Sequence, residues 1–273
     1  MNSSAVFCVR AAVASLLLAA LPAAAQVLGT ASGFAVLGAT PSVTNTGPSV
    51  ISGSVGVWPA ASITGFPPGV VVLGTGALHP GDAIAQQAQT DTTAAYLQLA
   101  GLVSAPIAPG LGGQSLTPGI YNAGAANLTG TLTLNGPGLY VFQTTALTTA
   151  AGPGAAVVSL TNGATPCDVW WQVGSSASLG TFTAFQGNIL ALTSITIATS
   201  ASLQGRALAR NGTVTLDSNS INACTGGTVP PFLVPPAGAA GVPIPTPTLS
   251  EWALILLATL MALTAMAALR RRR

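Results

Sequence analysis

Apolar residues alternate with small or polar residues in several short stretches of the chain. Four stretches can be aligned on a shared glycine, Gly53, Gly130, Gly187 or Gly205: ISGSVGV (51–57), LTGTLTL (128–134), FQGNILA (185–191) and SLQGRAL (202–208). A second set runs beside them and contains SVTN (42–45), ALTT (146–149), SITI (194–197) and TVTL (213–216). Alternation with a period of two is typical of β-strands, which place successive side chains on opposite sides. The chain is therefore predicted to be mainly β.

The two sets of strands recur at a nearly constant interval in the second half of the chain. Gly187 and Gly205 are 18 residues apart, and Ile195 and Val214 are 19 residues apart. A fixed period of this length favours a β-solenoid, in which each coil is built from short strands joined by corners. The alternative is a β-sandwich, which has turns every ~8–12 residues but no fixed repeat.

One segment free of glycine and proline, residues 82–100, predicts a helix. Asp82 suits its N-cap, and Gly101 suits the C′ position after its last turn. The apolar face is expected to contain Ile84, Ala88, Ala95, Leu99 and Leu102, with Tyr96 beside them. At ~1.5 Å per residue the helix spans about six coils stacked at ~4.7–4.9 Å. We therefore expect it to lie along the solenoid axis.

The start of the chain predicts a secretory signal peptide over residues 1–25. Arg10 precedes the uncharged apolar stretch 11–21, and three alanines at 23–25 precede Gln26. This order of a positive charge, an apolar segment and small residues is the pattern that export signals share.

The end of the chain predicts a transmembrane helix. Residues 252–269 carry no charge and are followed by four arginines at 270–273. A span of this length is close to what a bilayer requires, and the arginines are expected to stay cytoplasmic. A buried core helix is the alternative, but it would not end in a block of like charges. A Gly- and Pro-rich spacer at 226–246 separates this tail from the folded domain, expected at 26–225.

Charge is scarce between the two ends. The ionised residues between Gln26 and Thr246 are Arg206, Arg210, Asp82, Asp91, Asp168 and Asp217, and the chain has no lysine. Nucleic-acid binding requires clustered Lys and Arg to neutralise phosphates, so this class of function is excluded.

Two cysteines, Cys167 and Cys224, remain once Cys8 leaves with the signal peptide. In an oxidising compartment they can form a disulfide, and two free buried thiols are the alternative. His79 is the only histidine of the chain. Too few ligands are therefore present for a zinc site, and we expect no metal and no cofactor.

Catalysis has few candidate residues. His79 and Asp82 are close in sequence, but both are expected to belong to the turn that enters the helix. Trp170 and Trp171 could stack on sugars, although adjacent aromatics in a strand more often place one ring in the core and one on a face. We therefore expect a protein that is not an enzyme.

Several long strings in the middle of the chain carry a family resemblance. They are LGTASGFAVLGA (28–39), VTNTGPSVISGSVGV (43–57), ITGFPPG (63–69), HPGDA (79–83), LTPGIY (116–121), VWWQVGSSASLGTFTAFQGNILALTSIT (169–196) and GRALARNGTVTLDSN (205–219). Together they resemble the ice-binding-like domain of secreted bacterial and fungal proteins, over roughly residues 28–224. The resemblance implies a right-handed, three-faced parallel β-solenoid with one long α-helix packed along it.

The tail has a resemblance of its own. Residues 247–252 read PTLSEW, that is Pro247, Thr248, Leu249, Ser250, Glu251 and Trp252, and Ile244 stands apart from them. With the apolar segment and the arginines behind it, this motif resembles exosortase-type sorting signals of the IPTL-CTERM kind. The resemblance implies a Gram-negative source, export to the cell surface and a membrane protease that processes the tail. Until that cleavage the helix would anchor the chain in the inner membrane.

The second set of strands predicts a flat outward face. With Val43, Leu147, Ile195 and Val214 inside, stacked coils would align two rows of small side chains. The candidate ice-binding residues in these rows are Ser42, Thr44, Thr148, Ser194, Thr196, Thr213 and Thr215. Ala146 is the second outward neighbour of Leu147, on the same strand as Thr148. Threonine offers a hydroxyl that can hold a water molecule, and its β-branching limits the freedom of the side chain. We expect this face to bind ice or ordered water.

The glycine-centred set predicts a less even face. Its outward residues are expected to be Ser52, Ser54, Thr129, Thr131, Gln186, Asn188, Gln204 and Arg206.

Our leading hypothesis is an exported, non-enzymatic ice-binding protein. The alternative is a surface adhesion or matrix protein that binds another ligand such as a polysaccharide, and a carbohydrate-active enzyme is a distant third.

Overall fold

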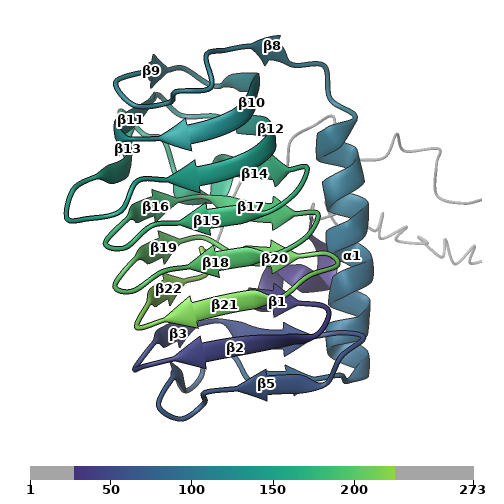
Figure 1. Cartoon of the computed structure of the whole chain (residues 1–273). Helices are drawn as coiled ribbons and strands as arrows, with labels where there is room; N and C mark the ends of the chain where they lie inside the picture. The colour runs from purple at the N-terminus through teal and green to yellow at the C-terminus, as the bar shows by residue number, and fades with distance from the viewer. Residues whose placement is uncertain (1–27, 225–273) are drawn as a thin grey trace, which may run out of the picture. The chain divides into compact units, whose positions relative to one another are not determined.

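Short strands stacked coil upon coil make up most of residues 28–224, the part of the chain that the computed structural model describes (Figure 1). Every strand pairing among these residues is parallel. The signal peptide predicted at 1–25, the spacer at 226–246 and the tail at 247–273 lie outside the described residues. Within 28–224, no helix is both long and apolar enough to cross a bilayer.

The strands form three ladders. The first, here called the threonine face, contains β5 (Ser62–Thr64), β2 (Ser42–Thr46), β21 (Val214–Asp217), β18 (Ile195–Ile197), β15 (Ala177–Leu179) and the last residues of β12 (Tyr140–Thr149) and β10 (Gly119–Leu128). The second, the amide face, contains β6 (Val70–Val71), β3 (Val50–Ser52), β22 (Ser220–Asn222), β19 (Ser202–Gln204), β16 (Ala184–Gln186), β13 (Ala156–Thr161), β11 (Gly130–Asn135) and β9 (Ser115–Leu116). The solenoid predicted from the repeat is confirmed.

The third ladder lies under the helix and is called the helix face. It contains β7 (Leu78–Pro80), β4 (Ser54–Val57), β1 (Phe34–Gly38), β20 (Ala207–Ala209), β17 (Asn188–Ala191), β14 (Val169–Val173), the first residues of β12 and β10, and β8 (Ala105–Pro106). Two short 3-10 helices, η1 (Gly29–Gly33) and η2 (Pro166–Asp168), precede β1 and β14. Strands β1, β14, β17 and β20 are buried at every residue because the core covers one side and α1 the other.

Corner glycines divide the stretches that the sequence predicted as single strands. Gly53, Gly187 and Gly205 have φ of 122°, 109° and 148°, values that side chains rarely allow, and each separates one strand from the next. A Cβ on Gly205 would lie 2.0 Å from the carbonyl oxygen of Gly187. The residues after each glycine therefore belong to the helix face. The prediction that Asn188 and Arg206 point outward is wrong, since they are 0% and 7% exposed.

Helix α1 (Ala83–Ala100) runs along the helix face and contacts η1, β1, β4, β7, β12, β14 and β17 (Figure 1). Asp82 is its N-cap, as predicted, but Gly101 ends it with φ of −82° rather than in the left-handed C′ conformation. The buried residues are Ala85, Ala88, Gln89, Thr92, Ala95, Tyr96 and Leu99. Ile84, predicted on this face, is 55% exposed because the buried stripe begins one residue later, at Ala85.

The coils do not stack in the order of the sequence. The first coil, β1 to β3, lies near one end of the stack, where Figure 1 shows β2 beside β5, and β4 to β7 extend from this coil to that end. Helix α1 then runs to the other end, and the later coils return until the last one pairs with the first. Val36 stands opposite Ala207, Val43 opposite Val214 and Val50 opposite Ser220. The N-terminal and C-terminal coils therefore share a seam.

The interior holds rows of aliphatic side chains and a stack of aromatic rings. Phe142 lies between Tyr121 and Trp171, with ring centroids 5.6 and 4.1 Å away, and Trp171 also contacts Phe185 at 4.9 Å. Trp170 lies on the opposite side of β14 and is 5% exposed. As predicted, one ring lies in the core and the other on the opposite face of the strand, but both tryptophans are buried, so neither ring is placed to stack on a sugar.

The N-cap of α1 predicts a loss of stability in acid. The Asp82 side chain accepts a 2.8 Å hydrogen bond from the N–H of Ala85, which lowers the pKa of Asp82, and the neighbouring His79 lowers it further. A carboxyl whose pKa is lower in the folded protein stabilises the fold above its unfolded pKa of about 3.9, and that contribution is lost as the pH falls through the folded value. Melting curves should therefore shift down below about pH 4.

Two variants test this assignment. Asp82→Asn should keep the cap but lose this part of the pH dependence, because an amide caps nearly as well and does not titrate. Asp82→Ala should cost about 1 kcal/mol at neutral pH. Equal pH profiles for the wild-type protein and Asp82→Asn would contradict the assignment.

Candidate functional site

One line of outward side chains on the threonine face runs through neighbouring strands in register. Its members, here called the threonine row, are Thr64, Thr44, Thr215, Thr196, Ser178, Thr148 and Asn127, each directly opposite the next. The seven residues come from seven different strands between residues 44 and 215, and only the coil register brings them together.

A second line lies two residues earlier on each strand. This serine row contains Ser62, Ser42, Thr213, Ser194, Ser176, Ala146 and Ala125. Ser42 stands opposite Ser62, and Ala146 opposite Ala125. Within one strand the two rows are ~6.6–6.8 Å apart, and successive strands are ~4.7–4.9 Å apart. All seven residues proposed from the sequence fall in these two rows.

The residues between the two rows point into the core. Val43, Val214, Ile195, Ala177 and Leu147 are all 0% exposed. Four of them were predicted to be inside, and the strand alternation then directs their neighbours outward. Because the inner side chains are tightly packed, the outer ones stand on a backbone with little freedom to move.

Hydroxyl groups on this face contact one another but remain open to solvent. Thr44 Oγ1 donates to Thr215 Oγ1 over 3.5 Å, and the hydroxyls of Thr213 and Thr215 are 3.2 Å apart. At the other end of the row the amide of Asn127 donates to Thr148 Oγ1 over 3.0 Å. A hydroxyl has one donor and two acceptor positions, so each can also bind water. These contacts restrict the rotation of the side chains.

Charge is kept at the edge of this face. Neither row contains an ionisable residue. The nearest carboxylate in sequence, Asp217, ends β21 opposite Thr46, where the hydroxyls of Thr199 and Ser218 both donate to it. The central part of the threonine face is uncharged and carries hydroxyls in register. This arrangement suits ordered water, because a strongly hydrated ion would impose its own arrangement of water.

The amide face is less regular. Ser52, Asn222, Gln204 and Gln186 are aligned on neighbouring strands, so long amide side chains replace the short hydroxyls. Val50 and Val70, at one end of it, are 49% and 52% exposed. The prediction of an uneven face is correct for the glutamines, whereas Arg206 and Asn188 belong to the buried helix face.

Six members of the two rows were missed from the sequence: Ser62, Thr64, Ala125, Asn127, Ser176 and Ser178. Ser178 precedes Thr196 by 18 residues, which is the spacing of the repeat and could have revealed it. Thr64 follows Thr44 by 20 residues, and Asn127 precedes Thr148 by 21. These irregular spacings hide the earlier coils from a search at a fixed period.

The remaining candidates have structural roles. The structure joins Cys167 and Cys224 in a disulfide, with Cα atoms 5.5 Å apart. His79 Nδ1 lies 2.8 Å from Asp82 Oδ2 and its ring packs against Phe34, so both residues belong to the turn that enters α1, as predicted. Within residues 28–224 no group of three or more His, Cys, Asp and Glu side chains is arranged to hold a metal ion.

The sequence model of the ice-binding-like family matches residues 37–222, which contain most of all three ladders. The chain belongs to the ice-binding-like family. A relative from Nostoc sp. (strain HG1) named ice-binding protein is 50% identical over 211 residues, which cover 74% of this chain and 76% of the relative. The model of the IPTL-CTERM motif matches residues 243–273, as the resemblance of the tail predicted.

Solved structures of the ice-binding-like family share the fold. The crystal structure of an ice binding protein from an Antarctic biological consortium has a TM-score of 0.67 and 43% identity, and the match covers 72% of this chain and 90% of that one. The ice-binding protein of Antarctomyces psychrotrophicus also has a TM-score of 0.67, with 38% identity and coverage of 73% and 98%. Both likenesses support the solenoid with one helix.

Proposed function

We propose that this chain is an exported, non-enzymatic ice-binding protein that adsorbs to ice through the threonine and serine rows. The observation that carries the proposal is the register of the threonine row, which places seven short polar side chains on seven consecutive strands. The relatives named ice-binding proteins, one of them 50% identical, support the choice of ligand.

The physical basis of adsorption is a regular array of weak contacts. Each hydroxyl can hold a water molecule, and each such bridge contributes little by itself. Because the side chains are β-branched or short and stand on a packed core, little conformational entropy is lost when the water becomes ordered. Many waters held in register can therefore join the face to the surface of an ice crystal.

The right-handed winding of the coils and the extent of the domain, residues 26–225, are part of the proposal. The IPTL-CTERM match supports export to the cell surface of a Gram-negative bacterium. A membrane protease would then recognise residues 247–252 and process the tail, which until then anchors the chain in the inner membrane through its apolar segment.

Growth of ice in the presence of the protein tests the proposal directly. A single ice crystal grown in a dilute solution of the full-length chain should become faceted, and recrystallisation of a frozen sample should slow. Facets arise because adsorbed protein stops growth on the planes to which it binds. Crystals that stay round at every protein concentration would rule out ice as the ligand.

A further inference from the structure

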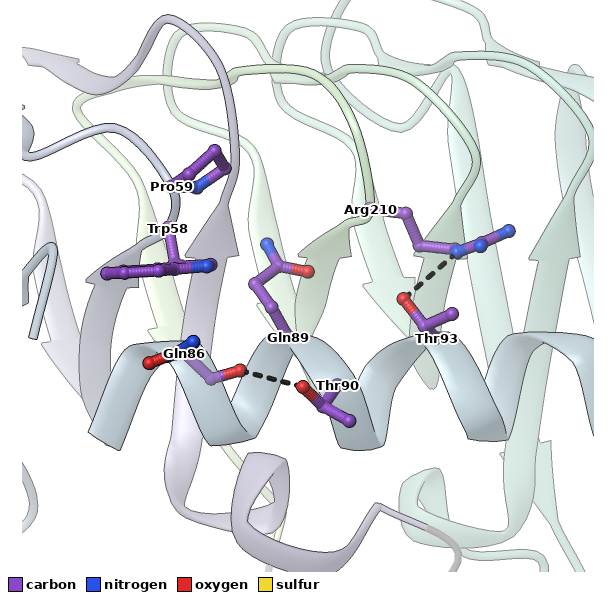
Figure 2. A pocket seen from close by; sticks show the side chains of 7 residues that line it. All are labelled: Trp58, Pro59, Gln86, Gln89, Thr90, Thr93 and Arg210. Atoms are coloured by element: carbon purple, nitrogen blue, oxygen red, sulfur yellow. Dashed lines mark hydrogen bonds between the residues drawn. The ribbon is translucent and has the colours of Figure 1, made fainter. Parts of the chain in front are cut away.

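A shallow depression of about 320 Å³ that is largely open to solvent, here called the cavity, lies between α1 and the corners that follow β4 and β20 (Figure 2). Its lining comes from Trp58 and Pro59 after β4, from one stripe of α1, and from Arg210 after β20. The stripe consists of Gln86, Gln89, Thr90 and Thr93. None of these residues belongs to the threonine or serine row, so the cavity is separate from the proposed ice-binding face.

The floor of the cavity is fixed by Gln89. Its side-chain nitrogen donates to the carbonyl oxygens of Gly38 and Ala209, over 2.7 and 2.9 Å, and the residue is 7% exposed. These two bonds join α1 to the ends of β1 and β20. The cavity is therefore built on a rigid base, which lowers the entropic cost of binding a ligand.

Arg210 supplies a cation at one end of the cavity. Its guanidinium lies over the ring of Tyr96, 4.6 Å from the centroid, and Nε donates to Thr93 Oγ1 over 3.4 Å. Among residues 28–224 no carboxylate lies within ion-pair distance of it. The two terminal nitrogens are therefore free to donate in parallel to a carboxylate, which is the geometry that arginine recognises best.

Trp58 lines the other end of the cavity, where its indole lies between Pro59 and Gln86 (Figure 2). It is half-buried, directly after β4, and β1 separates β4 from β20. The strand ends that carry Trp58 and Arg210 are therefore two strand spacings apart, about 9–10 Å at the backbone. One ligand can contact both only if it has a flat part and an anionic part at separate places.

We propose that this cavity binds a uronic-acid residue of an acidic polysaccharide. The apolar face of a sugar ring would pack on Trp58, as sugars and aromatic rings commonly do, and a carboxylate of the same chain would accept from Arg210. Gln86 and Thr90 are exposed and Thr93 is half-buried, so their amide and hydroxyl groups can bond sugar hydroxyls. The volume is at the lower end of the ~300–1,000 Å³ of small-molecule sites, which suits one or two sugar units.

The charge of the surroundings favours an acidic ligand over a neutral one. The described residues contain only two arginines and no lysine, and the other arginine, Arg206, is buried. Arg210 is thus the one cation of residues 28–224 placed to meet an external anion. Attachment of a cell-surface protein to an acidic matrix would be a function in addition to binding ice.

Calorimetric titration of the full-length chain with trigalacturonate tests the proposal. We expect binding that weakens as the ionic strength rises, because the contact to Arg210 is an ion pair. Arg210→Gln should weaken it about tenfold or more, and Arg210→Lys less, because lysine keeps the charge but loses the paired donors. Trp58→Ala should weaken it about tenfold through loss of the stacking surface.

Several comparisons make the result decisive. Gln87→Ala, on the same helix where Gln87 instead donates to Asp91, is the matched control and should bind as the wild-type protein does. Ice faceting by Arg210→Gln should be unchanged, which separates this proposal from the ice-binding one. Equal affinity for neutral cellotriose, competition by inorganic phosphate alone at the same concentration, or unchanged binding by Arg210→Gln would each overturn the proposal.

Discussion

Replacing Thr196 and Thr215 by tyrosine is expected to abolish ice faceting and the inhibition of recrystallisation. The two residues stand opposite each other in the middle of the threonine row, on β18 and β21. A phenol ring on each would project beyond the short side chains around it and hold the rest of the face away from ice. An array of weak water-mediated contacts is lost as a whole when its members cannot reach the surface together.

The stability of this variant should change little. Both side chains point away from the core, and surface substitutions usually alter the free energy of unfolding by less than about 0.5 kcal/mol. A melting temperature close to that of the wild-type protein would show that the fold is intact. Activity lost through unfolding would instead appear as a large fall in melting temperature.

The amide face offers a matched control. Thr133 and Ser159 are also a directly opposed pair of outward hydroxyl residues, on β11 and β13. Their replacement by tyrosine should leave ice faceting unchanged. If this control lost activity while the threonine-row variant kept it, the assignment of the faces would have to be reversed.

Replacing Arg206 by methionine is expected to lower the free energy of unfolding by about 3–5 kcal/mol. The guanidinium donates to the carbonyl oxygens of Ser32 and Cys224, over 2.7 and 2.8 Å, and to Asn188 Oδ1 over 2.9 Å. Methionine fills a similar volume but donates to none of them. A buried acceptor left without a partner costs about 1–3 kcal/mol, which explains the size of the effect.

The position of Arg206 increases its importance. Ser32 precedes the first coil and Cys224 follows the last, so the guanidinium joins the two ends of the described chain beside their shared seam. Burial lowers the pKa of Arg206 to about 10, and the group is therefore still charged at neutral pH. Its charge is balanced by the carbonyl dipoles of Ser32 and Cys224, since no carboxylate among residues 28–224 forms an ion pair with Arg206.

Chemical denaturation measures this effect, and Arg210→Gln is the control. Arg210 is half-buried at a corner and bonds only to the edge of α1, so its loss should cost less than about 1 kcal/mol. Equal stability of Arg206→Met and the wild-type protein would show that the buried contacts contribute no net stability.

The alternation of side chains let the sequence predict the inner and outer residues of the second strand set. Val43, Leu147, Ile195 and Val214 are buried, and the small polar residues between them form the two rows. The helix and its Asp82 cap were also predictable, since capping and freedom from glycine act within a few residues. These features depend on local chemistry, which a single sequence displays.

The corners were misread for a physical reason. Alternation continues through Gly53, Gly187 and Gly205, so the sequence gives no sign that the backbone turns there. Only the positive φ of these glycines moves the next residue onto another ladder. Arg206 and Asn188 were consequently predicted on a surface. A polar side chain can be recognised as buried only when the positions of its hydrogen-bond partners are known, and these partners lie far away in the sequence.

The sequence by itself determined the short strands and the one long helix, favoured a β-solenoid over a β-sandwich, and showed which residue types could face outward together. Only the tertiary structure decided the order of the coils and the membership of the rows. Thr44 stands opposite Thr215 because the last coil pairs with the first, across 171 residues. Such a pairing is set by the closure of the whole core, and no period along the chain encodes it.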